Sequence, residues 1–328
     1  MNADAARTEA RSLDRRWWVL IGIITVAAVL IRIYYVLKFR TDVTQNQLAD
    51  GTIYETQAWG DGLVFSKQAN LIADGDGLIA PLPFELVGVR QESADHPPLY
   101  TLYLTFWSLL GVRSEVGHML VTTPLGALAA PAFGLLGRRL AGPAVGLVSA
   151  LIGAFNPSII PYPGFVLSEA VTIPLAALSA HAAYRTYDDP NLKNAAYLGG
   201  ATGLAVLARA ELAMYVPFVI IPLLLVVKRD RSWTQRLSML AAAGVVCGAL
   251  VLPWVGYNLN RFDEPVFMSI GLDYSLVQGN CDESYGYGDS NLLGSYWLGC
   301  MGEALEGTGL AHVDQSYGAA HLRETAFD

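Results

Sequence analysis

Charged residues are scarce in this sequence. They make up 15% of its 328 residues, against about 25% in an ordinary soluble domain. Because 53% of the residues are hydrophobic, the composition excludes intrinsic disorder and argues against an ordinary water-soluble globule. Cysteine is scarce too, and three residues exclude a disulfide-dense secreted scaffold. A formal net charge of −8 argues against a nucleic-acid binder, which would need a basic face to meet phosphates.

What the sequence does contain is a series of long runs without charge. A helix needs about 20 apolar residues to cross the hydrocarbon core of a bilayer. Four runs are long enough: Trp17–Leu37, in which Arg32 is the single charge, Met119–Gly137, Leu140–Leu167 and Leu237–Asn260. Four shorter runs are Pro98–Val112, Ala170–Tyr184, Asn194–Ala208 and Leu212–Val227. So many runs without a polar face predict an all-α, multi-pass membrane protein, here expected in the plasma membrane, rather than buried helices of a large soluble protein.

Basic residues predict how these runs are oriented. Four arginines lie in residues 1–16 and no A-x-A cleavage site follows the first run, so we expect a cytoplasmic tail and a retained helix over 17–37. The other cytoplasmic basic residues would be Arg138, Arg139, Arg185, Lys193, Lys228, Arg229, Arg231 and Arg236. This assignment places a first loop, 38–97, and a segment, 258–328, on the extracytoplasmic side of a helix bundle, 98–257. It requires Pro98–Val112, about 22 Å long as a helix, to enter the membrane only partway.

The acidity of the chain is concentrated in the two extracytoplasmic regions. The first loop has nine acids and four bases, residues 258–328 have eleven acids and two bases, and the remainder has nine acids and fifteen bases. Cys281 and Cys300 both lie in the second region, where an oxidising environment favours a disulfide; two free thiols are the alternative. Because no span follows this region, we expect further spans in a longer chain.

The first loop contains the candidate catalytic groups. Asp61 directly precedes an amphipathic stretch, so its carboxylate would lie at a helix start near the membrane surface, as a catalytic base or as an N-cap. The segment 74–77, Asp-Gly-Asp-Gly, has no closing Glu for a calcium loop and is interpreted as a turn. Asp95 and His96 follow, directly before Pro97-Pro98-Leu99-Tyr100.

Ionisable residues also occur at the predicted outer ends of the spans. Glu169 follows the long neutral run, and Arg209 and Glu211 lie at a turn between two shorter ones. Such residues are costly near the bilayer and indicate a functional site; snorkelling or a surface ion pair is the alternative. Together, His96, Arg209 and Arg261 would suit a phosphate anion at the outer face.

The order of these motifs resembles the membrane glycosyltransferases of the GT-C superfold, and most closely family 39, which includes protein O-mannosyltransferases and the aminoarabinose transferase acting on lipid A. The resemblance covers Arg16 to about Cys300, and Gly279-Asn280-Cys281 with the second cysteine resembles the actinobacterial branch. The motifs are Gly60-Asp61-Gly62 with Phe65 and Gln68-Ala69-Asn70, Asp95-His96-Pro97-Pro98-Leu99-Tyr100, Leu167-Ser168-Glu169, Ala208-Arg209-Ala210-Glu211, and Leu252-Pro253-Trp254-Val255 with Asn258-Leu259 and Arg261-Phe262.

The resemblance implies a donor sugar linked to a polyprenyl phosphate, an acceptor hydroxyl on a protein, glycolipid or cell-wall polymer, and inversion at the anomeric carbon. Asp61 matches the family's general base. The family often has a second acid directly after this base, where this sequence has Gly62, so Glu169 would supply the second carboxylate. His96, Arg209 and Arg261 would face the donor phosphate, with Asp95, Tyr100 and Glu211 lining the site. No cofactor is assigned, although Asp61 with Glu169 could hold a divalent ion.

Two other classes of function remain open from the sequence. A transporter or flippase of a lipid-linked or small polar substrate would need ionisable groups near the bilayer midplane and inverted repeats. A non-catalytic membrane scaffold would bind partners through residues 258–328 and would not depend on Asp61.

Overall fold

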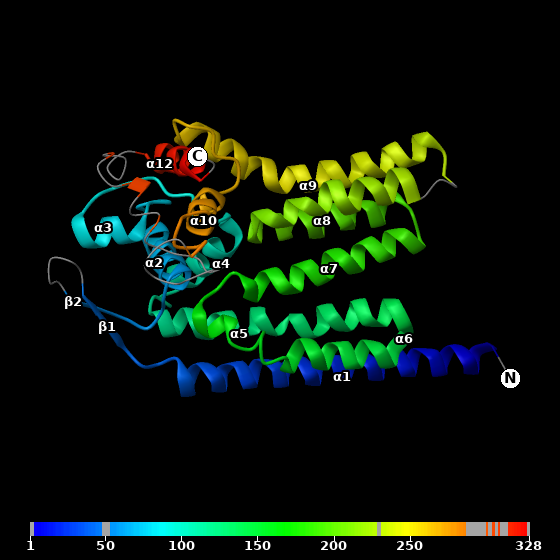
Figure 1. The fold of residues 1–328 in the computed structure, drawn as a ribbon. Coiled ribbons are helices and arrows are strands. Elements are labelled where there is room, and N and C mark those ends of the chain that lie inside the picture. The colour runs from blue at the N-terminus through cyan, green and yellow to red at the C-terminus, as the bar shows by residue number, and fades with distance from the viewer. Residues whose placement is uncertain are drawn as a thin grey trace.

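The chain forms a bundle of long helices with a smaller cap at one end (Figure 1). This computed structural model describes residues 3–47, 53–227, 231–286, 300, 304–305, 308 and 314–326. The bundle consists of α1 (Ala3–Phe39), α5 (Glu115–Ala127), α6 (Ala129–Phe155), α7 (Glu169–Asp188), α8 (Leu192–Ala208) and α9 (Trp233–Arg261). Short helical segments η2 (Ala210–Met214), η3 (Val216–Ile220) and η4 (Pro222–Val227) connect α8 to α9. The prediction of an all-α membrane protein is confirmed.

The cap is built from the first loop and the C-terminal region. It contains α2 (Asp61–Asp74), α3 (Pro81–Val87), α4 (Pro98–Leu109), α10 (Gly271–Gly279), α12 (Gln315–Thr325) and the turn η1 (Tyr162–Phe165). A short antiparallel hairpin pairs β1 (Thr44–Gln47) with β2 (Ile53–Thr56). In Figure 1 the cap lies at the end of the bundle opposite the N-terminus.

Three helical stretches are long and apolar enough to cross a membrane: Asp14–Phe39, Glu115–Phe155 and Trp233–Arg261. Their large apolar side chains face outward as well as inward; Val26 is 60% exposed and Val245 is 69% exposed. Such a continuous exposed apolar surface suits lipid rather than water. The protein is therefore membrane-embedded.

The expectation of one span over Leu140–Leu167 is wrong, because α6 is broken near the start of this run and ends before its last residues. The helix is broken at Ala141 and Gly142, where Gly142 has φ +89°, and the chain folds back on itself as a hairpin (Figure 1). The returning arm ends at Phe155, so it is only about 20 Å long. Glycines permit the close packing, because a Cβ on Gly153 would lie 2.6 Å from the Ala129 carbonyl oxygen.

Arg32, the single charged residue of the first span, links α1 to the end of the second arm of α6. Its side chain is fully buried and donates to the carbonyls of Ala154 at 2.9 Å and Gly153 at 3.3 Å. The last carbonyls of a helix lack partners within the helix, and a cation there also opposes the helix dipole. Arg32 therefore supplies hydrogen bonds to the C-terminal carbonyls of α6, which explains why a charged residue lies inside the first span.

The basic residues expected in the cytoplasm lie at the end of the bundle away from the cap. Arg138 pairs with Asp14, and Arg139 pairs with Asp188. Asp188 is the last residue of α7, and the two arginines lie just before the break in α6. In Figure 1, α7 ends at the same end of the bundle at which α1 begins. Two further members of this predicted group, Lys228 and Arg229, lie outside the described residues.

Candidate active site

Asp61 is the first residue of α2, at the junction between bundle and cap. Gly60 occupies the N-cap position with φ +50° and supplies no side-chain cap, so the interpretation of Asp61 as an N-cap is wrong. The Asp61 side chain is 64% exposed, and an acidic group in the first turn of a helix interacts favourably with the helix dipole. Its carboxylate is therefore accessible and held by a regular helix.

Gly62 explains why no second acid follows Asp61. A Cβ at this position would lie 2.0 Å from the backbone oxygen of Phe165, a distance that excludes any side chain. The start of α2 therefore packs directly against the backbone of η1. Arg40, at the end of α1, holds the other side of this turn: it donates to the Gly164 carbonyl at 2.9 Å and stacks over the Phe165 ring.

His96 faces Asp61 across the start of α2. Its Nε2 lies 3.8 Å from an Asp61 carboxylate oxygen, which is ion-pair distance for a protonated imidazole. The His96 ring stacks on Phe65 at 4.4 Å, and Tyr100 supports Phe65 edge-on at 4.9 Å. The imidazole is therefore fixed in orientation, with its side chain 23% exposed.

Arg209 lies between two carboxylates. It donates to Glu169, the first residue of α7, and to Glu211, at 3.3 Å, in the turn after α8. Glu169 is brought into position by a tight loop in which Val166 has φ +55°, a backbone conformation that is strained for a β-branched residue. The three side chains thus form one ion-pair cluster at the cap end of α7 and α8.

The Arg209 cluster and the Asp61–His96 pair are electrostatically connected through Glu211. Burial acts to raise the pKa of the Glu211 carboxyl, but three influences outweigh it: the hydrogen bond from its own backbone N–H, the hydrogen bond and charge of Arg209, and the charge of His96. The pKa of Glu211 is consequently below its usual value. Acidic and basic groups from the first loop, α7 and the α8 turn therefore share one end of the bundle.

The comparison with protein families gives an independent result. A family model described as dolichyl-phosphate-mannose-protein mannosyltransferase matches residues 95–257. Residues 95–257 belong to this family. No curated protein matches the chain. Asp95, His96, Glu169, Arg209 and Glu211 fall within the matched region of this mannosyltransferase family, whereas Asp61 and Arg261 lie outside it.

Family membership confirms the resemblance to GT-C glycosyltransferases. The protein is a membrane glycosyltransferase of the GT-C type. The family description also concerns sugar carried on a lipid phosphate, chemistry that requires cations near the phosphate and a base near the acceptor. Carboxylates and cations both lie at the cap end of the bundle.

Arg261 has a structural environment that differs from the phosphate-binding role expected for it. Its guanidinium donates to the carbonyls of Leu78 and Ser93 and to Glu92, and its Nε donates to Asn258. The side chain is only 9% exposed. These contacts fasten the end of α9 to the first loop, so we do not include Arg261 among the phosphate-binding groups.

Tyr100 and Asp95 also differ from expectation. The Tyr100 ring is fully buried and its hydroxyl shares a hydrogen bond with Thr122 at 3.0 Å, so Tyr100 supports Phe65 and does not line an open surface. The Asp95 carboxylate accepts from Ser93 at 2.8 Å. Burial, together with the carboxylates of Asp95 and Asp273, raises the pKa of the Tyr274 phenol well above its usual value, so Asp95 belongs to the contact with the C-terminal region.

The region after α9 packs against the end of the first loop, two residues before His96. The backbone N–H of Ile270 donates to the Ala94 carbonyl at 2.9 Å, and Ala94 packs with Phe262, Val266, Ile270 and Ala319. A disulfide joins Cys281 and Cys300 in this region. Among the described residues, Cys281, Glu283 and Cys300 form the one group of three with spacing for a metal, and its two sulfurs are already bonded to each other.

Phe65 was part of a sequence motif without an expected role, and Arg40 was not identified as a site-supporting residue. Phe65 lies one helical turn beyond Asp61, which places the two side chains on one face of α2. That spacing, with a histidine expected nearby, was the available signal for an aromatic support. Arg40 gave no comparable signal, because its partner is a backbone carbonyl 124 positions away.

Proposed function

We propose that this protein transfers a sugar from a polyprenyl-phosphate-linked donor to an acceptor hydroxyl at the extracytoplasmic end of the bundle. The observation that carries the proposal is the placement of an exposed carboxylate, Asp61, at 3.8 Å from His96. Family membership of residues 95–257 supports the donor class. The acceptor classes remain those expected from the sequence: protein, glycolipid or cell-wall polymer.

In the proposed reaction Asp61 acts as general base. The acceptor hydroxyl gives its proton to the Asp61 carboxylate as its oxygen forms a bond to the anomeric carbon of the donor. The bond between that carbon and the phosphate oxygen breaks, and the lipid phosphate leaves with the electron pair. A direct displacement of this kind inverts the anomeric centre.

The departing phosphate needs cationic partners, and His96 and Arg209 are proposed for that role. A phosphate group accepts charge-assisted hydrogen bonds best from a guanidinium or a protonated imidazole. Glu169, expected from the resemblance to be a second catalytic carboxylate, is instead proposed as a positioning residue, because it forms an ion pair with Arg209. Glu211 is proposed to assist from the exposed side of the same guanidinium.

The proposed orientation follows from the charge distribution. Basic residues such as Arg138 and Arg139 lie at the end of the bundle away from the cap, and the positive-inside rule assigns that end to the cytoplasm. The cap, with Asp61 and the disulfide, would then face the extracytoplasmic side. A polyprenyl-phosphate sugar in the outer leaflet could reach that end with its lipid tail in the bilayer.

Asp61→Asn tests the proposed base. We expect transfer from a polyprenyl-phospho-mannose donor to fall by about 100-fold or more, because general-base catalysis contributes about 10²–10⁴-fold. The matched control is Asp74→Asn at the other end of the same helix, whose carboxylate pairs with Arg113 on the surface. The measurement is radiolabelled sugar transfer by purified chain in nanodiscs, with other hexose and pentose donors run in parallel.

Unchanged transfer by Asp61→Asn would remove Asp61 as base. Donor movement across proteoliposomes without any transfer would overturn the enzymatic proposal in favour of a transporter. Arg32, the charged residue inside the first span, does not favour a transporter, since its guanidinium donates hydrogen bonds to the carbonyls at the end of α6. Partner binding that needs residues 258–328 but not Asp61 would favour a scaffold.

A further inference from the structure

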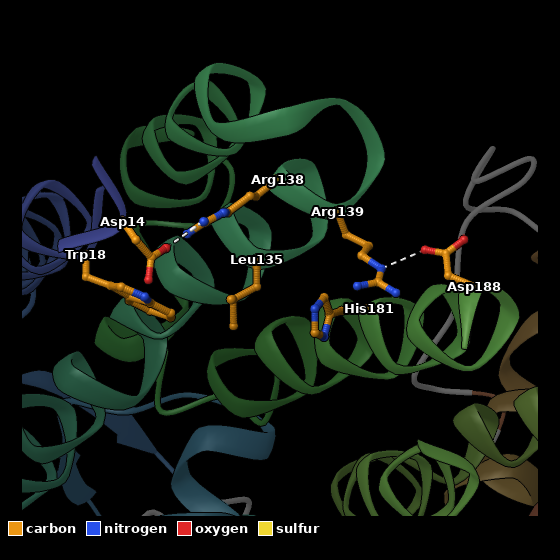
Figure 2. A pocket seen from close by; sticks show the side chains of 7 residues that line it. All are labelled: Asp14, Trp18, Leu135, Arg138, Arg139, His181 and Asp188. Carbon is orange, nitrogen blue, oxygen red and sulfur yellow. Dashed lines mark hydrogen bonds and ion pairs between the residues drawn. The ribbon is translucent and has the colours of Figure 1, made fainter. Parts of the chain in front are cut away.

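The end of the bundle away from the cap contains a cavity whose lining includes two arginine–aspartate pairs (Figure 2). Its volume is about 590 Å³, and it lies where α1, α6 and α7 meet. Both α1 and α7 pack against α6, so the cavity is bounded by three different helices. Its lining combines charged and apolar side chains: Asp14, Trp18, Leu135, Arg138, Arg139, His181 and Asp188.

Two arginines are held in place by carboxylates at the rim. Arg138 donates to Asp14 at 2.6 Å, and the Nε of Arg139 lies 2.7 Å from Asp188. Each arginine has further donors, since a guanidinium carries five N–H groups. The terminal nitrogens of Arg139 make no hydrogen bond to the part of the chain that the structure describes. The carboxylates therefore orient the two cations and leave donors for a third group.

His181 adds a polar ring to the lining of the cavity. Its Nδ1 is buried and makes no hydrogen bond among the described residues. A buried polar atom without a partner costs about 1–3 kcal/mol, so the position of this ring is not explained by its own hydrogen bonds. In Figure 2 the His181 ring lies next to the Arg139 guanidinium, so the ring forms part of the wall beside the unpartnered guanidinium nitrogens.

The remaining lining residues indicate the depth of the cavity in the bilayer. Trp18 and Leu135 supply apolar surface, while the neighbouring Trp17 packs beneath the Arg138 guanidinium at 4.4 Å and donates to the Pro143 carbonyl. Tryptophan with arginine at the ends of spans is typical of the lipid headgroup level. Basic pockets between membrane helices on this side bind phosphate-containing headgroups.

We propose that this cavity binds the phosphate group of an anionic membrane lipid, which accepts hydrogen bonds from Arg138 and Arg139 beside the His181 ring while its glycerol and upper chain cover Trp18 and Leu135. The inference is separate from the proposed sugar transfer, because the cavity lies at the opposite end of the bundle. Bound lipid would link α1 to α7 across α6 and stabilise the bundle. Free phosphate shares the same recognition chemistry, so the experiment compares the two sources.

Thermal unfolding of the full chain in a neutral detergent tests the proposal. We expect phosphatidylglycerol to raise Tm by about 4 °C at saturation, because a ligand that binds only the folded state stabilises it. Phosphatidylcholine, whose headgroup is neutral overall, should raise Tm less. A matching rise with inorganic phosphate alone would identify the free anion as the ligand of the same site.

Three variants make the test specific. Arg139→Gln should abolish the phosphatidylglycerol shift, whereas Arg185→Gln should keep it, since Arg185 is at the same end but bonds Asn194 and does not line the cavity. Asp188→Asn should enlarge the shift, because it removes the carboxylate that competes for Arg139. Native mass spectrometry of the same proteins counts retained lipid. Equal shifts in all four proteins, or no shift with either ligand in wild type and Asp188→Asn, would overturn the proposal.

Discussion

At the scale of single residues, the site depends on contacts that fix charged groups before any substrate is present. Phe65 and Tyr100 hold the His96 ring, and Glu169 and Glu211 hold Arg209. Fixed groups of this kind stabilise charge in a transition state without reorganising at that moment. The two carboxylates on Arg209 differ in burial: the Glu169 side chain is 26% exposed and that of Glu211 is 68% exposed.

This difference predicts unequal effects of neutralising them. Glu169→Gln should lower kcat by about 10- to 100-fold, because a displaced guanidinium no longer meets the transition-state charge. Glu211→Gln should stay within about fivefold, as expected for an exposed ion pair. The measurement is steady-state transfer kinetics with thermal unfolding as a folding control. Equal effects of the two substitutions would contradict the positioning role of Glu169.

Sequence patterns predicted which residues share one end of the bundle but not how they pair. Asp61, His96, Glu169 and Arg209 were expected together because they follow the ends of successive spans. The pairing of Glu169 with Arg209 depends on a strained loop at Val166 and on the turn after α8, neither of which has a periodic signal. The contacts of Arg261 have no periodic signal either, since its main acceptors are backbone carbonyls.

At the scale of elements, hydrophobic run length predicted α1 and α9 well and failed at α6. A neutral run predicts burial in lipid or protein, but it does not show where a helix reverses. The reversal needs one residue with positive φ, Gly142, and several small residues where the arms touch. The C-terminal region shows the opposite case: its polar composition predicted a separate segment, whereas its contacts with Ala94 make it part of the cap.

The disulfide of this region predicts a defined thiol count. Denatured, unreduced protein should react with one equivalent of maleimide, at Cys247, and with three after reduction. Closing a loop of this size stabilises by about 3 kcal/mol, so reduction should also lower the Tm of the intact protein. Mass spectrometry after labelling gives the count. Three reactive thiols without reductant would mean that Cys281 and Cys300 are not joined in the mature protein.

At the scale of the whole molecule, the two ends of the bundle differ in charge and in accessible chemistry. The cap contains the acidic loop and the proposed sugar-transfer site, and the opposite end contains the paired arginines. The separation follows from the distribution of acids and bases along the chain, which the sequence already contains. What composition could not provide is the cap itself, since it joins residues more than 150 positions apart, such as Arg261 with Ser93.

The proposed orientation predicts which end an impermeant reagent can reach. In a background where Cys247 is replaced by Ala, Glu55→Cys on the β-hairpin should react with an impermeant maleimide in intact cells. Lys193→Cys, in the first turn of α8, should react only after permeabilisation. Both positions are exposed. Reaction of the two variants in the reverse order would invert the topology and place the cap in the cytoplasm.

The attachment of Arg261 to the first loop has a consequence for the membrane in which the protein works. Helix α9 runs from Trp233 to Arg261, about 43 Å at 1.5 Å per residue, and so exceeds a hydrocarbon core of about 30 Å. A long helix adapts to bilayer thickness by tilting. Tilt at α9 would pull on Leu78 and Ser93 through Arg261 and displace His96 three residues farther along. Sugar transfer should therefore depend on acyl-chain length, with an optimum at the thickness where α9 leaves the loop undisturbed.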